Sequence, residues 1–132
     1  MRVDNLMIHP ELRRAGAGIR FLFHGFTMRT FRVANFVMRR AKGRCRSRMK
    51  YEQIFLPRTD GSLLRLCVYS PLTPLDGAPG LLWLHGGGYA MGCPEQDEAT
   101  VRRFVDAGPC VVAAPDYRLS QDAPYPAALE DC

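Results

Sequence analysis

Four consecutive residues, His85-Gly86-Gly87-Gly88, are the part of the sequence best suited to catalysis. They follow an apolar run over residues 81–84 and precede a segment with strong helix signals. Successive glycines let the backbone turn tightly and bring N–H groups close to a substrate oxygen. Such N–H groups stabilise the negative charge that develops on a carbonyl oxygen under attack, and loss of one donor costs about 2.7–4 kcal/mol in a hydrolase. The pattern therefore predicts an oxyanion hole on a strand-to-helix loop.

Two other interpretations of the glycine run are a plain strand-to-helix turn and a phosphate cradle. A Gly-x-Gly-x-x-Gly pattern would need a glycine at position 91, where the chain has Met91, and the sequence contains no Gly-Lys-Ser/Thr P-loop. Nucleotide binding is therefore excluded, while the plain turn stays an alternative. His85 is predicted to shape the loop rather than to act as a general base.

The strands that must position this loop are visible as apolar patterns. Alternation over residues 51–57 and 63–69, with turn residues at 59–62, predicts an antiparallel hairpin. The continuous apolar run 81–84 predicts a strand that is covered on both faces, as in a parallel sheet. A second apolar strand is predicted at 110–114, so the segment after the hairpin is a βαβ unit.

The helix of this βαβ unit is predicted to open at Pro94 and to close at Gly108-Pro109. Its acidic residues crowd the first turn, where the helix dipole favours negative charge: Glu95, Asp97 and Glu98. Its buried face is predicted to consist of Val101, Phe104 and Val105. A further helix is predicted to begin at the prolines near residue 124.

The first fifty residues differ from the rest in charge. They contain thirteen basic residues against two acidic ones, a net +11, while the remaining residues hold five against eleven, a net −6, which gives the overall +5. Residues 9–41 predict two basic amphipathic helices, the first ending near Gly25 and the second capped by Thr27. Residues 42–48 predict a loop. We therefore divide the chain into a basic helical segment, 1–50, and an α/β segment, 51–132.

Two stretches of the α/β segment resemble the hormone-sensitive-lipase-like branch of the α/β-hydrolases. These are LLWLHGGGYAMG, residues 81–92, and CVVAAPDYRLSQDAPYPAALED, residues 110–131. The resemblance covers residues 51–132, and the basic helices resemble the N-terminal cap of that branch. It implies that the N–H groups of Gly87 and Gly88 form the oxyanion hole. The family's Tyr-Arg-Leu-Ala/Ser-Pro-Glu is changed at its last two positions to Gln121 and Asp122.

The resemblance implies an α/β fold in which the chain supplies the N-terminal portion of an α/β-hydrolase: a hairpin and a βαβ unit, preceded by cap helices. The family's strand order places the four predicted strands in the order 1-2-4-3. The sheet is then incomplete, with the strand at 81–84 as an open edge. Because an open apolar edge favours aggregation, we expect poor solubility or a molten state for these residues alone.

The activity implied is hydrolysis of small-molecule carboxylic esters, with no metal or organic cofactor. That chemistry needs a serine within Gly-x-Ser-x-Gly, followed by an acid and a histidine. The chain has four serines, and none has glycines two residues away on both sides: Ser47, Ser62, Ser70 and Ser120. No histidine follows His85. We therefore predict an N-terminal esterase fragment, truncated or interrupted, that is inactive by itself. A noncatalytic relative of the family is an alternative.

The basic helices carry a second alternative function. Phenylalanines placed between arginines are typical of helices that lie on a membrane surface or bind anionic ligands. We nevertheless predict that these arginines face water, that nucleic acid is not a partner, and that membrane association is the less favoured interpretation. The sequence leaves the oligomeric state open.

Composition favours a soluble cytoplasmic protein. Hydrophobic residues make up 47% and charged residues 23% of the sequence, an ordinary globular balance. No apolar run is long enough to span a bilayer, and the N-terminus lacks the apolar core of a signal peptide. The five cysteines show no Cys-x-x-Cys spacing, which argues against a zinc or redox site.

Overall fold

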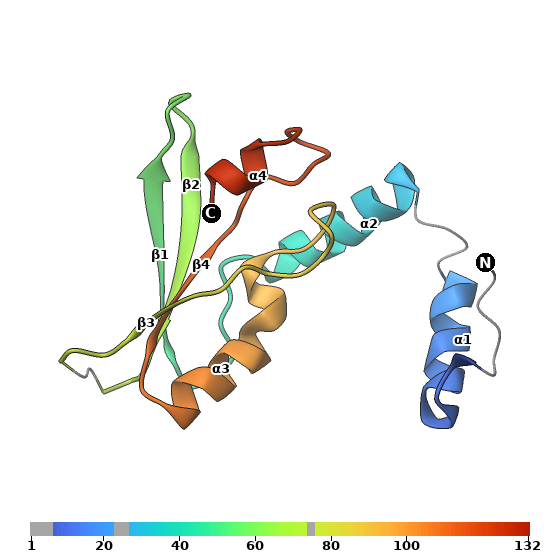
Figure 1. Cartoon of the computed structure of the whole chain (residues 1–132), viewed down its shortest axis with the longest axis horizontal. Coiled ribbons are helices and arrows are strands. Elements are labelled where there is room, and N and C mark those ends of the chain that lie inside the picture. Colours follow the sequence, from blue (N-terminus) through green and yellow to red (C-terminus); the bar gives the residue numbers. More distant parts are fainter. Residues whose placement is uncertain (1–6, 23–26, 74–75) are drawn as a thin grey trace.

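The computed structural model describes residues 7–22, 27–73 and 76–132. Two helices precede a four-stranded sheet with a third helix between its last two strands, and a single helical turn follows (Figure 1). The helices are α1 (Arg13–Leu22), α2 (Met28–Met38), α3 (Glu98–Ala107) and α4 (Ala127–Glu130). The strands are β1 (Lys50–Pro57), β2 (Leu63–Ser70), β3 (Gly80–Leu82) and β4 (Val111–Pro115). Short 3-10 helices are η2 (Pro10–Leu12), η3 (Arg39–Ala41) and η4 (Pro94–Asp97).

The strand order in the sheet is β1-β2-β4-β3, which confirms the predicted order and the open edge at β3. The β1–β2 hairpin is antiparallel along its full length, from Lys50 opposite Ser70 to Pro57 opposite Leu63. β4 runs antiparallel to β2 and parallel to β3, as a βαβ unit requires. β3 ends earlier than predicted, although the Trp83 N–H still donates to the Ala113 carbonyl at 2.8 Å.

One face of the sheet is covered by α3 and forms the core. Val101 of α3 is fully buried, and Val105 is 6% exposed. Both belong to one buried cluster with alternate residues of β2 and β4: Cys67, Tyr69, Val112 and Ala114. The prediction that Phe104 is also buried was wrong, because its side chain is 46% exposed and only its ring lies against Trp83, with centroids 5.6 Å apart.

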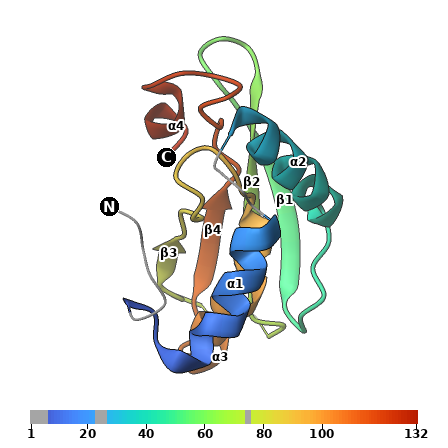
Figure 2. The same cartoon turned by 90° about the vertical axis from the view of Figure 1, so that its right-hand side faces the viewer.

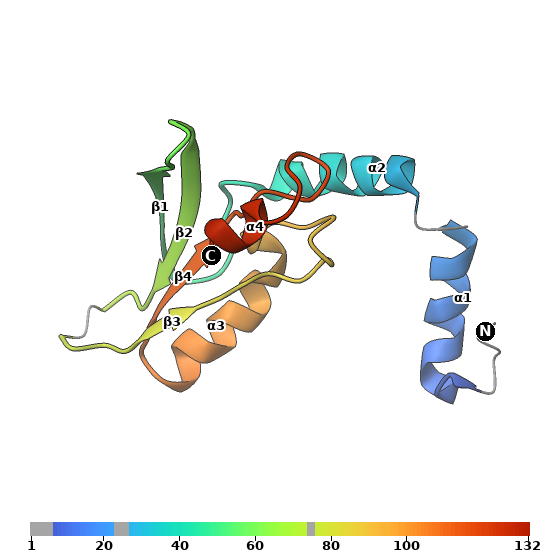
Figure 3. The ribbon, with the colours of Figure 1, turned by 45° about the horizontal axis from the view of Figure 1, so that its top comes forward.

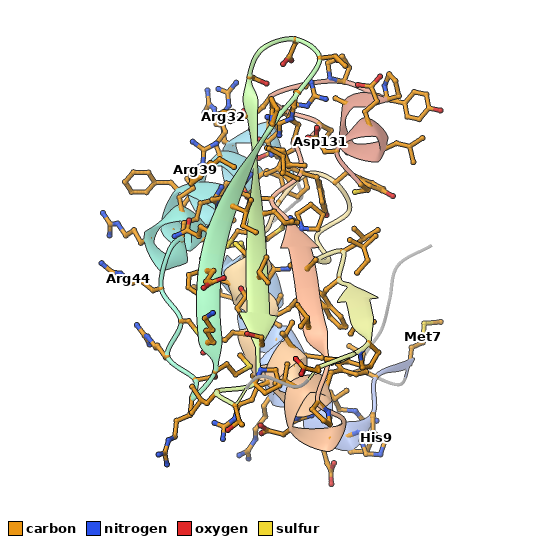
Figure 4. All side chains as sticks on the ribbon, turned by 90° about the vertical axis from the view of Figure 1, so that its left-hand side faces the viewer. Met7, His9, Arg32, Arg39, Arg44 and Asp131 are labelled. Carbon is orange, nitrogen blue, oxygen red and sulfur yellow. The ribbon has the colours of Figure 1, made fainter. Side chains whose placement is uncertain are left out.

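The opposite face of the sheet is bare in the described part of the chain. In Figure 2 the helices α1, α2 and α3 lie in front of the sheet, and Figure 4 looks onto the other side. Val68, Ala113 and Leu82 stand opposite one another in neighbouring strands and so share this face. Leu82 is 54% and Leu84 49% exposed, so the prediction of a strand covered on both faces was wrong.

The N-terminal helices meet the rest of the molecule through α2. Thr27 caps α2 by accepting a hydrogen bond from the Thr30 N–H, as predicted, while Gly25 lies outside the described residues. α1 lies at the far end of α2 from the sheet (Figure 3). Arg32, Arg39 and Arg44 lie along the β1 side of the molecule (Figure 4). No helix among the described residues is long and apolar enough to cross a membrane.

The last helix forms after the prolines, as predicted. α4 begins at Ala127, after Pro126, and makes a single turn. Such a short helix is not stable by its own hydrogen bonds. It is held by Asp131, whose buried carboxylate binds two guanidinium groups: Arg58 through Nε at 2.7 Å and Arg118 through Nε at 3.0 Å. Asp131 lies near α4 at the hairpin end of the sheet (Figure 4).

Candidate active site

The glycine loop, residues 85–92, connects β3 to η4 and requires glycine at two positions. Gly87 has φ +132°, and a Cβ at this position would overlap the carbonyl oxygen of Met91. Gly92 has φ +118°, and a Cβ there would lie 2.7 Å from the Gly86 oxygen. Both positions therefore exclude a side chain, through backbone angle and through space. The end of the loop packs directly on its beginning.

The predicted oxyanion donors lie in the part of this loop that is open to solvent. Among residues 7–22, 27–73 and 76–132, no group accepts a hydrogen bond from the N–H of Gly87 or Gly88. Gly88 borders two hollows, one of about 460 Å³ that is mainly apolar and one of about 320 Å³. Tyr89 and Leu129 line both. This geometry would allow a carbonyl oxygen to approach the two N–H groups, and their role as donors stays a prediction.

His85 is a buried, neutral part of the loop. Its Nδ1 lies 3.0 Å from the Gly86 carbonyl oxygen, which can only accept, so we assign the proton to Nδ1. Its Nε2 is buried without a partner among the described residues. Burial lowers the pKa of His85. The ring stacks on Tyr117 with centroids 4.1 Å apart, and the Tyr117 hydroxyl donates to the His85 carbonyl at 2.6 Å.

Besides Tyr117 and Gln96, which donate to the His85 and Gly86 carbonyls, two polar side chains bind the far end of the glycine loop, and neither contact was predicted from the sequence. Asn35 of α2 donates through Nδ2 to the Ala90 carbonyl at 3.0 Å and accepts from the Gly92 N–H at 3.1 Å. Gln121, which replaces the family's proline, donates to the same Ala90 carbonyl at 2.6 Å. Asp122, which replaces the family's glutamate, pairs with Arg39 of η3 at 3.5 Å. The segment after β4 is therefore tied both to the loop and to the N-terminal helical segment.

The acidic residues after the loop form direct hydrogen bonds with residues that are distant in the sequence. Glu95 is 6% exposed and binds Arg65 of β2 through both carboxylate oxygens, at 2.6 and 3.1 Å. Burial alone would raise the pKa of Glu95, but hydrogen bonds from Arg65 and from the Gly43 N–H lower it to about 2. Asp97 accepts a hydrogen bond from the Trp83 indole at 2.9 Å. Glu95 and Asp97 lie in the first turn of η4, and Glu98 in the first turn of α3, as predicted; the contacts of Glu95 and Asp97 add a structural role to that placement.

A second carboxylate, that of Asp131, holds the other end of the segment after β4. Burial would raise its pKa, and the hydrogen bonds from Arg58 and Arg118 lower it instead. Its side chain is 1% exposed. This cluster could not be predicted from the sequence, because its members are separated by up to 73 residues. No three His, Cys, Asp or Glu side chains within the described ranges could together hold a metal ion.

Comparison with known proteins shows which proteins this chain is similar to in sequence and fold. A family model described as the alpha/beta hydrolase fold matches residues 81–132. Esterase LipI from Mycobacterium tuberculosis is 41% identical over 66 residues, which are 48% of this chain and 21% of that protein. Carboxylesterase NlhH from the same organism is 33% identical over 64 residues, 48% of this chain and 20% of the relative.

Solved structures match a larger share of the chain. A hyperthermophilic esterase from the archaeon Pyrobaculum calidifontis superimposes with a TM-score of 0.70 and 26% identity, over 94% of this chain and 41% of its own. The ester-hydrolase EH1AB1 from the Lake Arreo metagenome gives a TM-score of 0.71 and 25% identity, over 95% and 42%. The sequence matches thus span about a fifth of those relatives, and the structural matches about two fifths. Residues 81–132 therefore match the α/β-hydrolase fold family, and the described fold is similar to the N-terminal part of esterases that have this fold.

Proposed function

We propose that these residues form the oxyanion-hole part of a serine carboxylic-ester hydrolase. The observation that carries this proposal is the pair of consecutive N–H groups on Gly87 and Gly88, which have no acceptor in the described part of the chain; Gly88 lines an apolar hollow. An ester carbonyl oxygen within hydrogen-bond reach of both would gain stabilisation as it becomes an oxyanion. An apolar group of the ester would occupy the hollow of about 460 Å³.

The nucleophile, acid and base are proposed to come from polypeptide outside residues 1–132, so that these residues alone are inactive. Ser120 lines the hollow beside Gly88, but no histidine or carboxylate in the described part of the chain hydrogen-bonds to its hydroxyl. His85 is unsuited as a base for it, because its imidazole is buried and engaged by Gly86 and Tyr117. The bare sheet face and the β3 edge are the surface on which such polypeptide would pack.

Hydrolysis of p-nitrophenyl esters by the complete natural protein that contains these residues tests the proposal. We expect turnover of short-chain esters and a loss of about 10²–10³-fold in kcat for Gly87→Ala, the size expected when an oxyanion donor is misplaced. Gly108→Ala is the matched control, because a Cβ there meets nothing within 4 Å and lies far from the loop in the sequence. Absence of hydrolysis by the complete protein would instead identify a noncatalytic relative.

A second candidate function concerns the outward face of α2. Val33, Phe36 and Val37 are 65%, 61% and 60% exposed, and the Arg40 guanidinium lies over the Phe36 ring at 4.9 Å. Exposed apolar residues beside arginines suit binding to an anionic lipid surface. Co-sedimentation with phosphatidylserine-containing vesicles at low and high salt tests this function, with Phe36→Ala/Arg40→Ala as the variant. Equal behaviour with neutral vesicles would reject it. A cytoplasmic location stays a prediction.

A further inference from the structure

Asn35 lies on the inward face of α2 and is the buried polar residue of that helix, 8% exposed. Its amide makes two hydrogen bonds to the glycine loop, one as donor to the Ala90 carbonyl and one as acceptor from the Gly92 N–H. The two backbone groups lie two residues apart. The Asn35 side chain thus forms one donor and one acceptor bond with the loop backbone, as a neighbouring strand would. Its two partners lie 55 and 57 residues away in the sequence.

The contacts of Gly92 carry this restraint to the start of the loop. A Cβ at Gly92 would lie 2.7 Å from both the Gly86 oxygen and His85 Nδ1, so residue 92 packs tightly against residues 85 and 86. Those two residues precede Gly87 and Gly88 directly. The Ala90 and Met91 N–H groups also converge on the Gly87 carbonyl, at 3.1 and 3.2 Å. A displacement at Gly92 or Ala90 therefore changes the direction of the Gly87 and Gly88 N–H groups.

We propose that Asn35 is a positioning residue for the oxyanion-hole turn, through which the orientation of helix α2 sets the orientation of the Gly87 and Gly88 N–H groups. The catalytic meaning of this coupling rests on the proposed function, whereas the coupling itself does not. Both polar ends of the Asn35 amide are used in it. Because α2 also carries the exposed face of Val33, Phe36 and Val37, binding at that face would reach the loop directly through the Asn35 amide.

The structure offers a matched comparison at the Ala90 carbonyl. Gln121 donates to the same oxygen at 2.6 Å, and Asn35 is the side chain that accepts the Gly92 N–H. Gln121→Ala removes one of two donors to Ala90 and leaves the Gly92 N–H satisfied. Asn35→Ala removes the other donor and also leaves the buried Gly92 N–H without its acceptor. Asn35→Asp keeps the size and the acceptor for Gly92 but loses the donor to Ala90.

The test is amide NMR of the full natural chain, without ester or inhibitor. For Asn35→Ala we expect the Gly92 amide to exchange at least tenfold faster and the Gly87 and Gly88 amide resonances to shift. The Val112 amide in the sheet should exchange within twofold of its original rate. Asn35→Asp should retain the protection of Gly92, and Gln121→Ala should move Gly87 and Gly88 less than Asn35→Ala does. If Asn35→Ala does not fold, the comparison of Asn35→Asp with Gln121→Ala remains, and Asn35→Asp is then expected to shift the Gly87 and Gly88 resonances.

Unchanged Gly87 and Gly88 resonances in a folded Asn35→Ala protein, or in Asn35→Asp where Asn35→Ala does not fold, would overturn the proposal. Failure of ester hydrolysis by the complete protein would refute the proposed function and leave these amide measurements valid. In a protein that does hydrolyse esters, Asn35→Ala should lower kcat by at least tenfold with KM within threefold, because the residue positions donors and does not touch the ester. A change confined to KM would contradict the positioning role.

Discussion

The two faces of the sheet are built from similar apolar residues but have very different surroundings. On one face Cys67, Tyr69 and Val112 are completely buried beneath α3. On the other, Leu82 and Leu84 of the β3 segment are about half exposed, and Ile54 of β1 is 43% exposed. The glycine loop follows β3. It is held by hydrogen bonds from Asn35 of α2, whereas Gly87 and Gly88 are exposed and their N–H groups have no acceptor among the described residues.

This difference shows which part of the site these residues can form by themselves. Burial under α3, the Arg65–Glu95 pair and the Asn35 contacts are enough to hold the turn in its shape. These contacts do not include a nucleophile or a base that faces the Gly87 and Gly88 N–H groups. We infer that the oxyanion-hole backbone is organised independently of the groups that would attack the ester.

The largest effect is expected on the covered face, at Arg65. Arg65→Ala leaves Glu95 buried without its partner, and loss of one member of a buried pair costs about 3–5 kcal/mol. Urea unfolding followed by circular dichroism measures the free energy of unfolding. The control is Arg102→Ala, which breaks an exposed pair with Asp106 and should cost about 0.3–0.5 kcal/mol. Similar losses for both variants would show that the covered face is not closed in solution.

The pH dependence of stability should report the same buried pair. The pKa of Glu95 is about 2 in the folded chain and 4.5 ordinarily, so its stabilisation is complete above pH 4.5 and is lost as the pH falls towards 2. At about 1.4 kcal/mol per pKa unit, the contribution at neutral pH is about 3 kcal/mol. Unfolding measured between pH 2 and 6 should have a shallower slope for Glu95→Gln. The remaining slope is assigned to the other carboxylates whose pKa is lowered, Asp131, Glu98 and Asp60.

A smaller effect should separate Gly87 and Gly88, the two proposed oxyanion donors, which differ in the space around them. Gly88→Ala adds a Cβ that meets nothing, at φ +60°, and should cost about 1–2 kcal/mol through backbone strain. Gly87→Ala adds a clash with the Met91 carbonyl and should cost about 1–3 kcal/mol more. Thermal unfolding of both variants measures the difference. Equal costs would mean that the 87–91 turn is looser than its contacts indicate.

The smallest effect is expected on the bare face. Leu82→Ser should change the free energy of unfolding by less than about 0.5 kcal/mol, because Leu82 is already half exposed. Val101→Ala, on the covered side, should cost about 1.5–3 kcal/mol. Light scattering should also show less self-association for Leu82→Ser. A cost for Leu82→Ser as large as that for Val101→Ala would mean that this face is covered in solution.

Sequence patterns were sufficient for the parts of the fold that depend on neighbouring residues. Alternation and the turn at 59–62 predicted the hairpin, and the apolar runs with the helix signals between them predicted the parallel pair β3–β4. The exposure of Phe104 and Leu82 was not predicted, because the sequence pattern of an apolar residue is the same whether or not another element covers its side chain. Burial depends on what packs there, and hydrophobicity alone does not report it.

The contacts around the site were less predictable than the site itself. The glycine run could be read directly, since few residues adopt the backbone angles of Gly87 and Gly92. Asn35, Arg65 and Asp131 looked like ordinary polar residues of a helix, a strand and a helix end. Their partners lie between 13 and 73 residues away, and only the folded chain brings them together. Buried pairs between residues so far apart produce no repeating pattern in the sequence.

The carboxylate of Asp131 also has a consequence for any surface that later meets the segment after β4. By holding Arg58 and Arg118, it removes most of the conformational freedom of a helix that is only one turn long. Leu129, which lines both hollows beside Gly88, therefore lies on an anchored turn before anything packs on it. Association with an already ordered surface loses less entropy than association that must also order its target. Asp131 would thus favour binding at this surface, because α4 is already ordered before a partner packs on it.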